Sequence, residues 1–357
     1  MHYRVITTAV LLSIVGAGSA HAQEEEEKKQ NFVCRPQVYD RLVKAQKALS
    51  ENNYKDAEEK ALKIQRRIRL NDHEKALVMQ TLGYIYAGQE RLKLAAKTLT
   101  ECYDLHSLPA ATQVSMLFNI GQIHMANKDF KSAVRVFNVW LTKAKKPKPS
   151  ALYTIAAANY QIKDFKAAIR HSEAALKQTK KPKDALLQLL LSAYVETKKY
   201  RSAIRIISII VERHPDRKNN WLQLAALYGE VGDEKRALAV MELAKDAGAL
   251  KKSDEYVQLS QRLLAEEIPW EAAKLLETSM KDGTVETNAD NSKLIATAWL
   301  QSRNLDKAAP ALEAAAKLAK DGDLYVRLAQ LELERERWKQ AISASEKALK
   351  KGGLKSK

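Results

Sequence analysis

The 357-residue sequence has little glycine, little proline and almost no cysteine. It contains 12 glycines and 8 prolines, about half of the usual shares of ~7% and ~5%. A chain so poor in these residues should have few tight turns, which argues against an all-β sandwich or barrel. Two cysteines are too few for a disulfide-dense scaffold, or by themselves for a four-ligand zinc site. Because 46% of the residues are hydrophobic, the chain is also too apolar to be disordered throughout.

The sequence also lacks the motifs of common enzyme chemistry. It has no phosphate-binding loop, no G-x-G-x-x-G, no G-x-S-x-G and no H-E-x-x-H. Its seven histidines are scattered, and for His124 packing in the core is favoured over metal binding. The carboxylates fall in mixed-sign runs, such as 332–337, that are typical of exposed helix surfaces. We therefore predict no catalytic residue, no metal site and no cofactor.

Residues 1–22 have the features of an export signal. Arg4 supplies a positive charge, the segment from Val5 to Ala20 is uncharged, and Ala20 and Ala22 place small residues where signal peptidase reads them. The uncharged segment is short for a membrane span, which needs about 20 residues. We expect cleavage after Ala22, a periplasmic mature chain, and no transmembrane span once the signal is removed.

The net charge of +17 raises nucleic acid as a partner. Removal of residues 1–22 leaves +16, and +12 of that belongs to residues 141–220 alone. No base-stacking motif accompanies this charge, and the periplasm holds no chromosomal DNA. We therefore expect no nucleic-acid binding.

A repeat of about 35 residues organises the rest of the chain. The segments N-K-D-F-K-S-A-V (127–134), I-K-D-F-K-A-A-I (162–169) and T-K-K-Y-R-S-A-I (197–204) are similar and lie 35 residues apart. One alanine recurs in steps of 33 to 38 residues, at Ala57, Ala95, Ala133, Ala168, Ala203, Ala237, Ala273, Ala308 and Ala341. Twelve positions before most of these stands a small residue: Ala45, Gly83, Gly121, Ala156, Ala225, Ala296 and Ala329. Three positions before many of them stands an aromatic residue: Tyr54, Phe130, Phe165, Tyr200, Trp270 and Trp338.

This pattern resembles the tetratricopeptide repeat (TPR) family, whose unit is 34 residues in two antiparallel helices. The two small residues would lie where the helix backbones approach closely, because larger side chains there would overpack the pair. The aromatic residue would fill the gap at the turn. Leu191 and Gln261 stand at the small position in units five and seven, and Leu92, Glu234 and Leu305 replace the aromatic residue.

The resemblance predicts an all-α, right-handed α-solenoid of about nine TPR helix-turn-helix units over residues 38–351. We expect the polar segment 23–37 before it to be disordered, and residues 352–357 to form a short tail. The last helix would have no following helix to cover Trp338, Ile342 and Leu349, so a second copy of the chain is one candidate to cover it.

By resemblance, the first helix of each unit lines a concave binding surface. In units two to five the relevant positions hold aromatic and amide side chains, which suit an extended or helical peptide. Packing between repeats is an equally open role for each aromatic residue. The candidates are Tyr84, Phe118, Gln122, Tyr153, Tyr160 and Gln188.

Basic residues gather in the turns between units three, four, five and six. Since equivalent turns of a solenoid stack along one edge, they should form a basic edge. It would serve solubility, or bind an acidic protein or an anionic envelope surface. Its residues are Lys143, Lys145, Lys146, Lys148, Lys180, Lys181, Lys183, Arg213, Arg217 and Lys218.

The two cysteines leave two interpretations open. Cys102 stands at a position that holds alanine in other units, which favours a small buried side chain. A Cys34–Cys102 disulfide could instead clip the N-terminal segment to the array in the oxidising periplasm. Sequence spacing does not place the two Cα atoms within bonding range, so the buried small side chain is the favoured interpretation and the disulfide is the alternative.

Four blocks resemble one particular group of exported TPR proteins, encoded beside TonB, ExbB and ExbD homologues in Gram-negative bacteria. They lie at 71–78, 82–87, 220–242 and 347–355. The block at 220–242 is the most specific of the four. The resemblance implies a periplasmic protein–protein scaffold that assists TonB-dependent uptake, with TonB, ExbD or transporter segments as partners. The alternatives are an envelope adaptor that binds peptidoglycan or anionic lipid, and an outer-membrane assembly factor.

Overall fold

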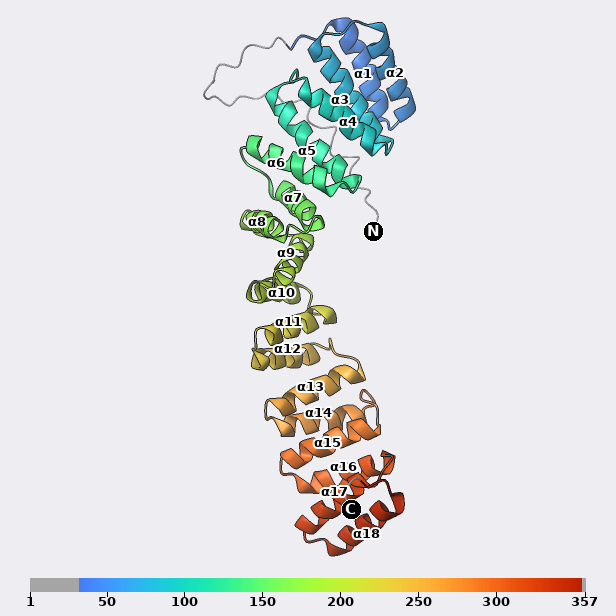
Figure 1. The fold of residues 1–357 in the computed structure, drawn as a ribbon, viewed down its shortest axis with the longest axis vertical. Helices are drawn as coiled ribbons and strands as arrows, with labels where there is room; N and C mark the ends of the chain where they lie inside the picture. The colour runs from blue at the N-terminus through green and yellow to red at the C-terminus, as the bar shows by residue number, and fades with distance from the viewer. Residues whose placement is uncertain (1–31, 355–357) are drawn as a thin grey trace. The chain divides into compact units, whose positions relative to one another are not determined.

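The computed structural model describes residues 32–354, and these form eighteen α-helices and no strand (Figure 1). The expected all-α fold of repeated helical hairpins is confirmed. The predicted signal peptide, residues 1–22, lies outside the described residues. The chain divides into two compact units, Met1–Ala193 and Tyr194–Lys357, and the boundary falls inside α9.

Unit 1 holds four hairpins and most of α9 (Figure 1, blue to green). Its helices are α1 (Pro36–Ser50), α2 (Tyr54–Arg67), α3 (Asp72–Gly88), α4 (Leu92–Asp104), α5 (Ala110–Ala126), α6 (Phe130–Lys143), α7 (Pro149–Gln161), α8 (Phe165–Lys177) and α9 (Asp184–Glu196).

Unit 2 continues the same alternation (Figure 1, green to red). Its helices are α10 (Tyr200–Arg213), α11 (Lys218–Glu230), α12 (Glu234–Asp246), α13 (Ser253–Ala265), α14 (Pro269–Lys281), α15 (Ala289–Gln301), α16 (Leu305–Leu318), α17 (Asp323–Glu334) and α18 (Trp338–Lys351).

The array begins two residues earlier than the sequence predicts. Arg35 is the extended N-cap of α1, and Pro36, whose missing N–H costs nothing at a helix start, opens the helix. Phe32 stacks 5.3 Å from His73, and the side chain of Asn71 donates to the carbonyl of Val33. The expectation of disorder for 23–37 is therefore wrong for residues 32–37, and residues 23–31 lie outside the described part of the chain.

The alanines of the repeat lie where the helices of each hairpin meet. Eight of the nine recurring alanines are fully buried, and Ala341 is 3% exposed. A Cβ atom added to Gly83 would overlap Leu99, and one added to Gly121 would overlap the ring of Phe137. At Gly83 and Gly121 a small residue is thus required, because the facing helix occupies the space. The equivalent position of the fifth hairpin holds the buried Leu191.

Two details of the repeat differ from expectation. Gln261 is exposed and the neighbouring Ser260 is fully buried, so in the seventh hairpin the small position shifts by one residue. Trp270 and Trp338 are 47% and 62% exposed, so these two aromatic residues do not fill a gap at their turns. In the first hairpin Tyr54 does pack closely, since a Cβ atom on Gly88 would overlap its ring.

Every hairpin turn has three residues, and all nine share one backbone conformation. The residue two positions before the second helix has a positive φ in each case, and only one of these residues is glycine. The next amide N–H donates to the carbonyl five residues back, as Asp164 does to Asn159, which closes the first helix with a Schellman-type bond. The nine residues are Asn52, Glu90, Lys128, Lys163, Lys198, Gly232, Glu267, Arg303 and Glu336.

These turns predict that substitutions at two equivalent positions change the free energy of unfolding in opposite directions. Lys163, at φ +63°, is strained, and Lys163→Gly should raise the free energy of unfolding by about 0.5 kcal/mol, because relief of strain exceeds the entropy cost. Gly232, at φ +73°, has nothing within 4 Å of an added Cβ atom, so Gly232→Ala should lower it by about 1 kcal/mol through backbone strain alone. Urea midpoints of the two variants would contradict this reading if both shifted in the same direction.

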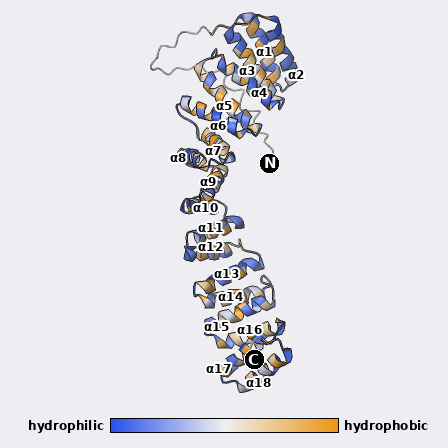
Figure 2. Ribbon diagram, viewed as in Figure 1, coloured by the Kyte–Doolittle hydropathy of each residue, from blue (hydrophilic) through white to orange (hydrophobic). Residues whose placement is uncertain are grey.

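Hydrophobic residues are distributed along all the helices rather than gathered in one segment (Figure 2). Among residues 32–354, no helix combines the length and hydropathy that a membrane crossing requires.

Candidate binding surfaces

Seven exposed lysines lie on two consecutive inter-hairpin loops of unit 1. Lys143 ends α6, and loop 144–148 leads to α7; loop 178–183 joins α8 to α9. None of the seven forms an ion pair with a described residue. We call Lys143, Lys145, Lys146, Lys148, Lys180, Lys181 and Lys183 the lysine loops.

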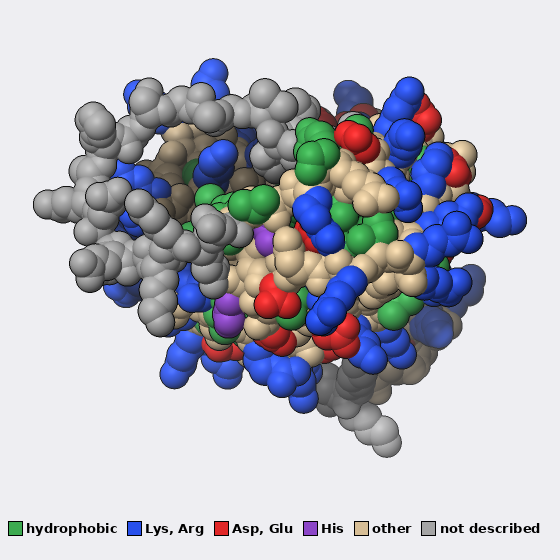
Figure 3. Space-filling view, turned by 90° about the horizontal axis from the view of Figure 1, so that it is seen from above, with side chains coloured by type: hydrophobic (Ala, Val, Ile, Leu, Met, Phe, Trp, Pro, Cys, Tyr) green, Lys and Arg blue, Asp and Glu red, His purple; other side chains and the backbone are tan. Residues whose placement is uncertain are grey.

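Acidic residues near the lysine loops in the sequence are few. From residue 143 to residue 184 they are Asp164, Glu173 and Asp184. Asp164 caps α8 by accepting from the amide of Ala167 at 3.0 Å, at the opposite end of its hairpin from the loops. On the face of the molecule drawn in Figure 3, many Lys and Arg side chains project at the edge, with Asp and Glu side chains between some of them.

The other three residues of the predicted basic edge belong to unit 2. Arg213 and Arg217 are exposed. Lys218 is only partly exposed, and its Nζ pairs with Glu255 at 2.6 Å. Lys218 is therefore an internal ion-pair partner, which corrects its assignment as part of a free basic edge.

The predicted groove residues divide between packing and exposure. Phe118 lies 5.3 Å from Phe137 and 4.9 Å from Trp140, ring centre to ring centre, so it is part of the core of its hairpin. The ring of Tyr160 packs edge-on against Phe165 at 5.2 Å. Packing between helices thus accounts for these two aromatic residues.

Among the remaining groove candidates, one hydroxyl is hydrogen-bonded within the array. Tyr84 accepts a hydrogen bond from the side chain of Asn119 at 2.9 Å, and burial raises its pKa. Tyr153 packs beside Leu152 and Leu186, Gln122 is half-buried, and Gln188 is exposed. Tyr84 and Asn119 form a polar contact between two neighbouring first helices, a pairing that the repeat pattern did not reveal.

An ion pair, and not a disulfide, fastens the N-terminal segment to the array. Both cysteines are free; Cys102 is fully buried and its thiol donates to the carbonyl of Ala76 at 3.1 Å. Burial raises the pKa of Cys102 to about 12. The Cys34–Cys102 bridge that the sequence left open is not formed in the structure.

The fastening residue is Glu74, whose side chain is fully buried. Its Oε1 accepts from the backbone N–H and Nε of Arg35 at 2.9 and 2.8 Å, and its Oε2 accepts from Nη2 at 2.6 Å. The Arg35 side chain and the amides of Arg35 and Asn71 lower the pKa of Glu74 to about 2. Glu74 also completes the capping box of α3, so one carboxylate both starts a helix and joins two hairpins.

Unit 2 contains a similar device. Glu255, in the first turn of α13, accepts from Lys218 and from the amides of Lys251 and Lys252 at 2.8 and 3.0 Å. In both units a cation at the start of one hairpin neutralises a buried glutamate at the start of the next. Sequence reasoning missed both pairs, although the N-D-H-E motif at 71–74 contains a capping-box signature.

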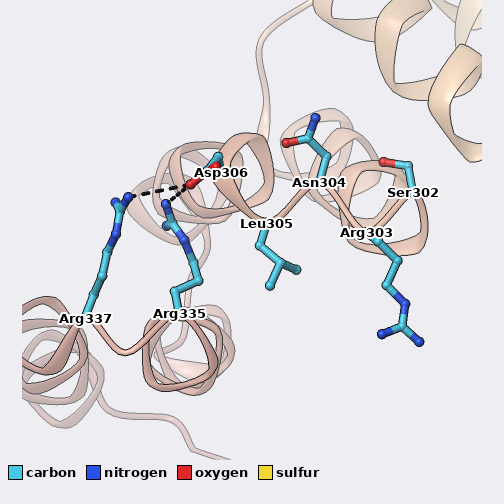
Figure 4. A pocket seen from close by; sticks show the side chains of 7 residues that line it. All are labelled: Ser302, Arg303, Asn304, Leu305, Asp306, Arg335 and Arg337. Atoms are coloured by element: carbon cyan, nitrogen blue, oxygen red, sulfur yellow. Dashed lines mark hydrogen bonds and ion pairs between the residues drawn. The ribbon is translucent and has the colours of Figure 1, made fainter.

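An open cleft of about 560 Å³ lies between the last two hairpins of unit 2 (Figure 4). The guanidinium groups of Arg335 and Arg337 point toward Asp306, at 2.5 and 3.6 Å, whereas Arg303 points away from them. Arg335 is 8% exposed and also pairs with Glu332 at 3.0 Å. Because two carboxylates already neutralise Arg335, the cleft is a weak site for an anion.

Within residues 32–354, no group of three or more His, Cys, Asp or Glu side chains is arranged to hold a metal ion.

Comparison with known proteins supports the repeat assignment locally. The tetratricopeptide repeat family matches residues 294–353, which lie within α15–α18 and the following glycines. No curated protein matches the sequence.

Several solved structures are similar at low identity. A tetratricopeptide repeat protein from Parabacteroides merdae is 19% identical over 73% of this chain and 99% of its own, with a TM-score of 0.43. The C-terminal part of a TPR protein from Cytophaga hutchinsonii is 17% identical over 78% and 95%, with a TM-score of 0.43. YrrB, described as a TPR protein with an unusual peptide-binding site, is 14% identical over 48% and 86%, with a TM-score of 0.40. These values are too low to indicate a shared function.

Proposed function

We propose that this chain is a periplasmic protein–protein interaction scaffold. The observation that carries the proposal is the ninefold repetition of one helical hairpin. Stacked hairpins present extended surfaces, and binding is the usual role of such arrays. The tetratricopeptide match at 294–353 supports the same conclusion.

The more specific proposal is an accessory role in TonB-dependent energy transduction and outer-membrane uptake. Its support is the resemblance of four sequence blocks to exported TPR proteins encoded beside TonB systems. The longest, 220–242, spans α11, the turn with Gly232 and most of α12. TonB, ExbD or transporter segments would be the partners, and the lysine loops would receive an acidic part of one of them.

A capture experiment tests this proposal. The mature protein, immobilised, should retain a purified periplasmic segment of TonB, of ExbD or of an outer-membrane transporter. Neutralising Lys145, Lys146, Lys180 and Lys181 to glutamine should lower the affinity by about tenfold and flatten its salt dependence, since exposed charges are screened by salt. The matched control neutralises Lys235, Lys320, Lys339 and Lys350, exposed lysines of unit 2 with no ion pair among the described residues. Retention of none of the three segments would remove the TonB role.

The lysine loops also favour a second function, an envelope adaptor that binds peptidoglycan or anionic lipid. Their exposed charges would be attracted to either surface. This function predicts salt-sensitive sedimentation with purified sacculi or anionic vesicles that the four-lysine variant loses and the unit 2 control keeps. Sedimentation that is equal for both variants would count against it.

A further inference from the structure

We propose that the chain's own acidic run, Glu24–Glu27, binds to the lysine loops of unit 1 after export. The run would occupy this surface until a more acidic partner displaces it. The proposal rests on the lysine loops, on the place where the N-terminal segment joins the array, and on the length of chain between them.

The lysine loops carry charge that the described residues leave unneutralised. Their seven lysines are exposed, and none has an ion-pair partner among residues 32–354. Glu24, Glu25, Glu26 and Glu27 are four consecutive carboxylates, the longest acidic run in the sequence. Surface and segment are therefore complementary in sign, and both belong to unit 1.

The N-terminal segment joins the array on the edge where the inter-hairpin loops lie. Asn71, in the loop between α2 and α3, holds the carbonyl of Val33 at 3.1 Å. His73 contacts the carbonyl of Ser107, in the following loop between α4 and α5, at 2.7 Å. The lysine loops are the next two loops of the same kind along the chain. The described start of the N-terminal segment, at Val33, therefore meets the array on the edge that carries them.

The chain between the run and Val33 is long enough to reach. Neighbouring packed helices lie about 8–10 Å apart, so loops 144–148 and 178–183 lie roughly 20 and 30 Å from loop 68–71. Glu27 stands six positions before Val33 and Glu24 stands nine positions before it. Fully extended, these spans reach about 20 and 30 Å before side chains are added. The reach of the extended chain is therefore comparable to the distance from Val33 to the lysine loops.

The tether explains why weak contacts suffice. Individual pairs of exposed charges contribute little and are screened by salt. A short linker, however, holds the run at an effective concentration on the order of millimolar, so that several weak pairs act together. A free acidic ligand must compete with this internal one, which would make the scaffold selective for partners of higher acidic density.

Carbodiimide cross-linking tests the contact without any partner. The reagent activates a carboxylate, which then forms an amide with a lysine Nζ that lies in contact, while the reagent leaves as a urea. In the mature chain beginning at Gln23, we expect mass spectrometry to join residues 24–27 mainly to the lysine loops. An equal mixture of ¹⁴N- and ¹⁵N-labelled protein shows whether the links are intramolecular. The yield should fall about fivefold at 1 M salt, where the Debye length is about 3 Å.

Two results would overturn the proposal. One is cross-linking to Lys235, Lys320, Lys339 and Lys350 as often as to the lysine loops. The other comes from an octaglutamate peptide used as a probe: it should bind about threefold more tightly once Glu24–Glu27 are changed to glutamine, and equal affinity would exclude competition. Because neither measurement involves a TonB component, this proposal and the proposed function can fail separately.

Discussion

Replacement of Glu74 by glutamine should lower the free energy of unfolding at pH 7 by about 2–3 kcal/mol, because it removes a buried carboxylate and leaves the Arg35 guanidinium without its partner. The Glu74 side chain is fully buried whereas that of Arg35 is 52% exposed, so water compensates part of the loss. The amides of Arg35 and Asn71 donate to different carboxylate oxygens. Because glutamine keeps only one acceptor oxygen, one of these amides also loses its partner. The effect should be concentrated in α1–α3.

The Arg35–Glu74 pair makes the stability of unit 1 depend on pH in the acidic range. The pKa of Glu74 falls from the ordinary 4.5 to about 2 in the folded chain. A depressed pKa means that the stabilisation is fully present above pH 4.5 and is lost as the pH falls from 4.5 toward 2. The wild-type protein should therefore lose up to about 3 kcal/mol over this window, and Glu74→Gln should be insensitive to it at this site.

Hydrogen exchange of the α1–α3 amides, with urea titrations at pH 7 and pH 3, measures both effects. A local readout is needed because repeat arrays can unfold in parts. The matched control is Glu59→Gln, which breaks an exposed i,i+4 pair with Lys63 and should cost less than about 0.5 kcal/mol. If the two variants behaved alike, Glu74 would not be the fastening residue.

The sequence predicted the hairpins well because their packing leaves a local signature. The recurring alanines and Gly121 must be small, since a facing helix fills the space beside them. The buried alanine recurs in all nine hairpins, so it appears as a period in the sequence. One exposed glutamine, Gln261, marks where the period shifts by one residue.

The scarcity of glycine was a poorer guide to the turns. It favoured an all-α fold, which the structure has, but the inference of few tight turns was wrong. The chain makes nine three-residue turns with a positive φ, and eight use residues such as Lys163 and Asn52 in place of glycine. The hydrogen bonds that close each hairpin hold these residues in a conformation that their own preferences disfavour.

The repeat pattern did not predict the contacts between particular hairpins. Arg35 and Glu74 are 39 residues apart, and Lys218 and Glu255 are 37 apart, so each pair joins two hairpins that the repeat treats as equivalent. A periodic pattern displays what the hairpins share, and it does not display a contact that joins one particular pair of them. The groove aromatics show the converse: Phe118 matched a binding position but is held by Phe137 and Trp140.

One substitution, glycine to alanine within a helix, should have opposite effects at two sites. At Gly121 in α5, the new Cβ atom would overlap the fully buried ring of Phe137. Overpacking of this kind typically costs about 3 kcal/mol at its upper range. The higher helix propensity of alanine offsets only about 1 kcal/mol of this cost. Gly121→Ala should therefore lower the free energy of unfolding by about 2 kcal/mol.

At Gly229 in α11, the nearest atom to an added Cβ is Oε1 of Glu234 at 3.4 Å, an ordinary contact. Gly229→Ala should therefore raise the free energy of unfolding by up to about 1 kcal/mol through helix propensity alone. Urea titrations of the two variants compare their free energies of unfolding. A double variant tests whether the Phe137 ring causes the loss at Gly121. Phe137→Leu removes the ring, so in its background Gly121→Ala should cost at least 1 kcal/mol less, a coupling within the range for residues in contact. An equal cost in both backgrounds would mean that the ring does not set the size limit at Gly121, and that the repeat's small residue is required for some other reason.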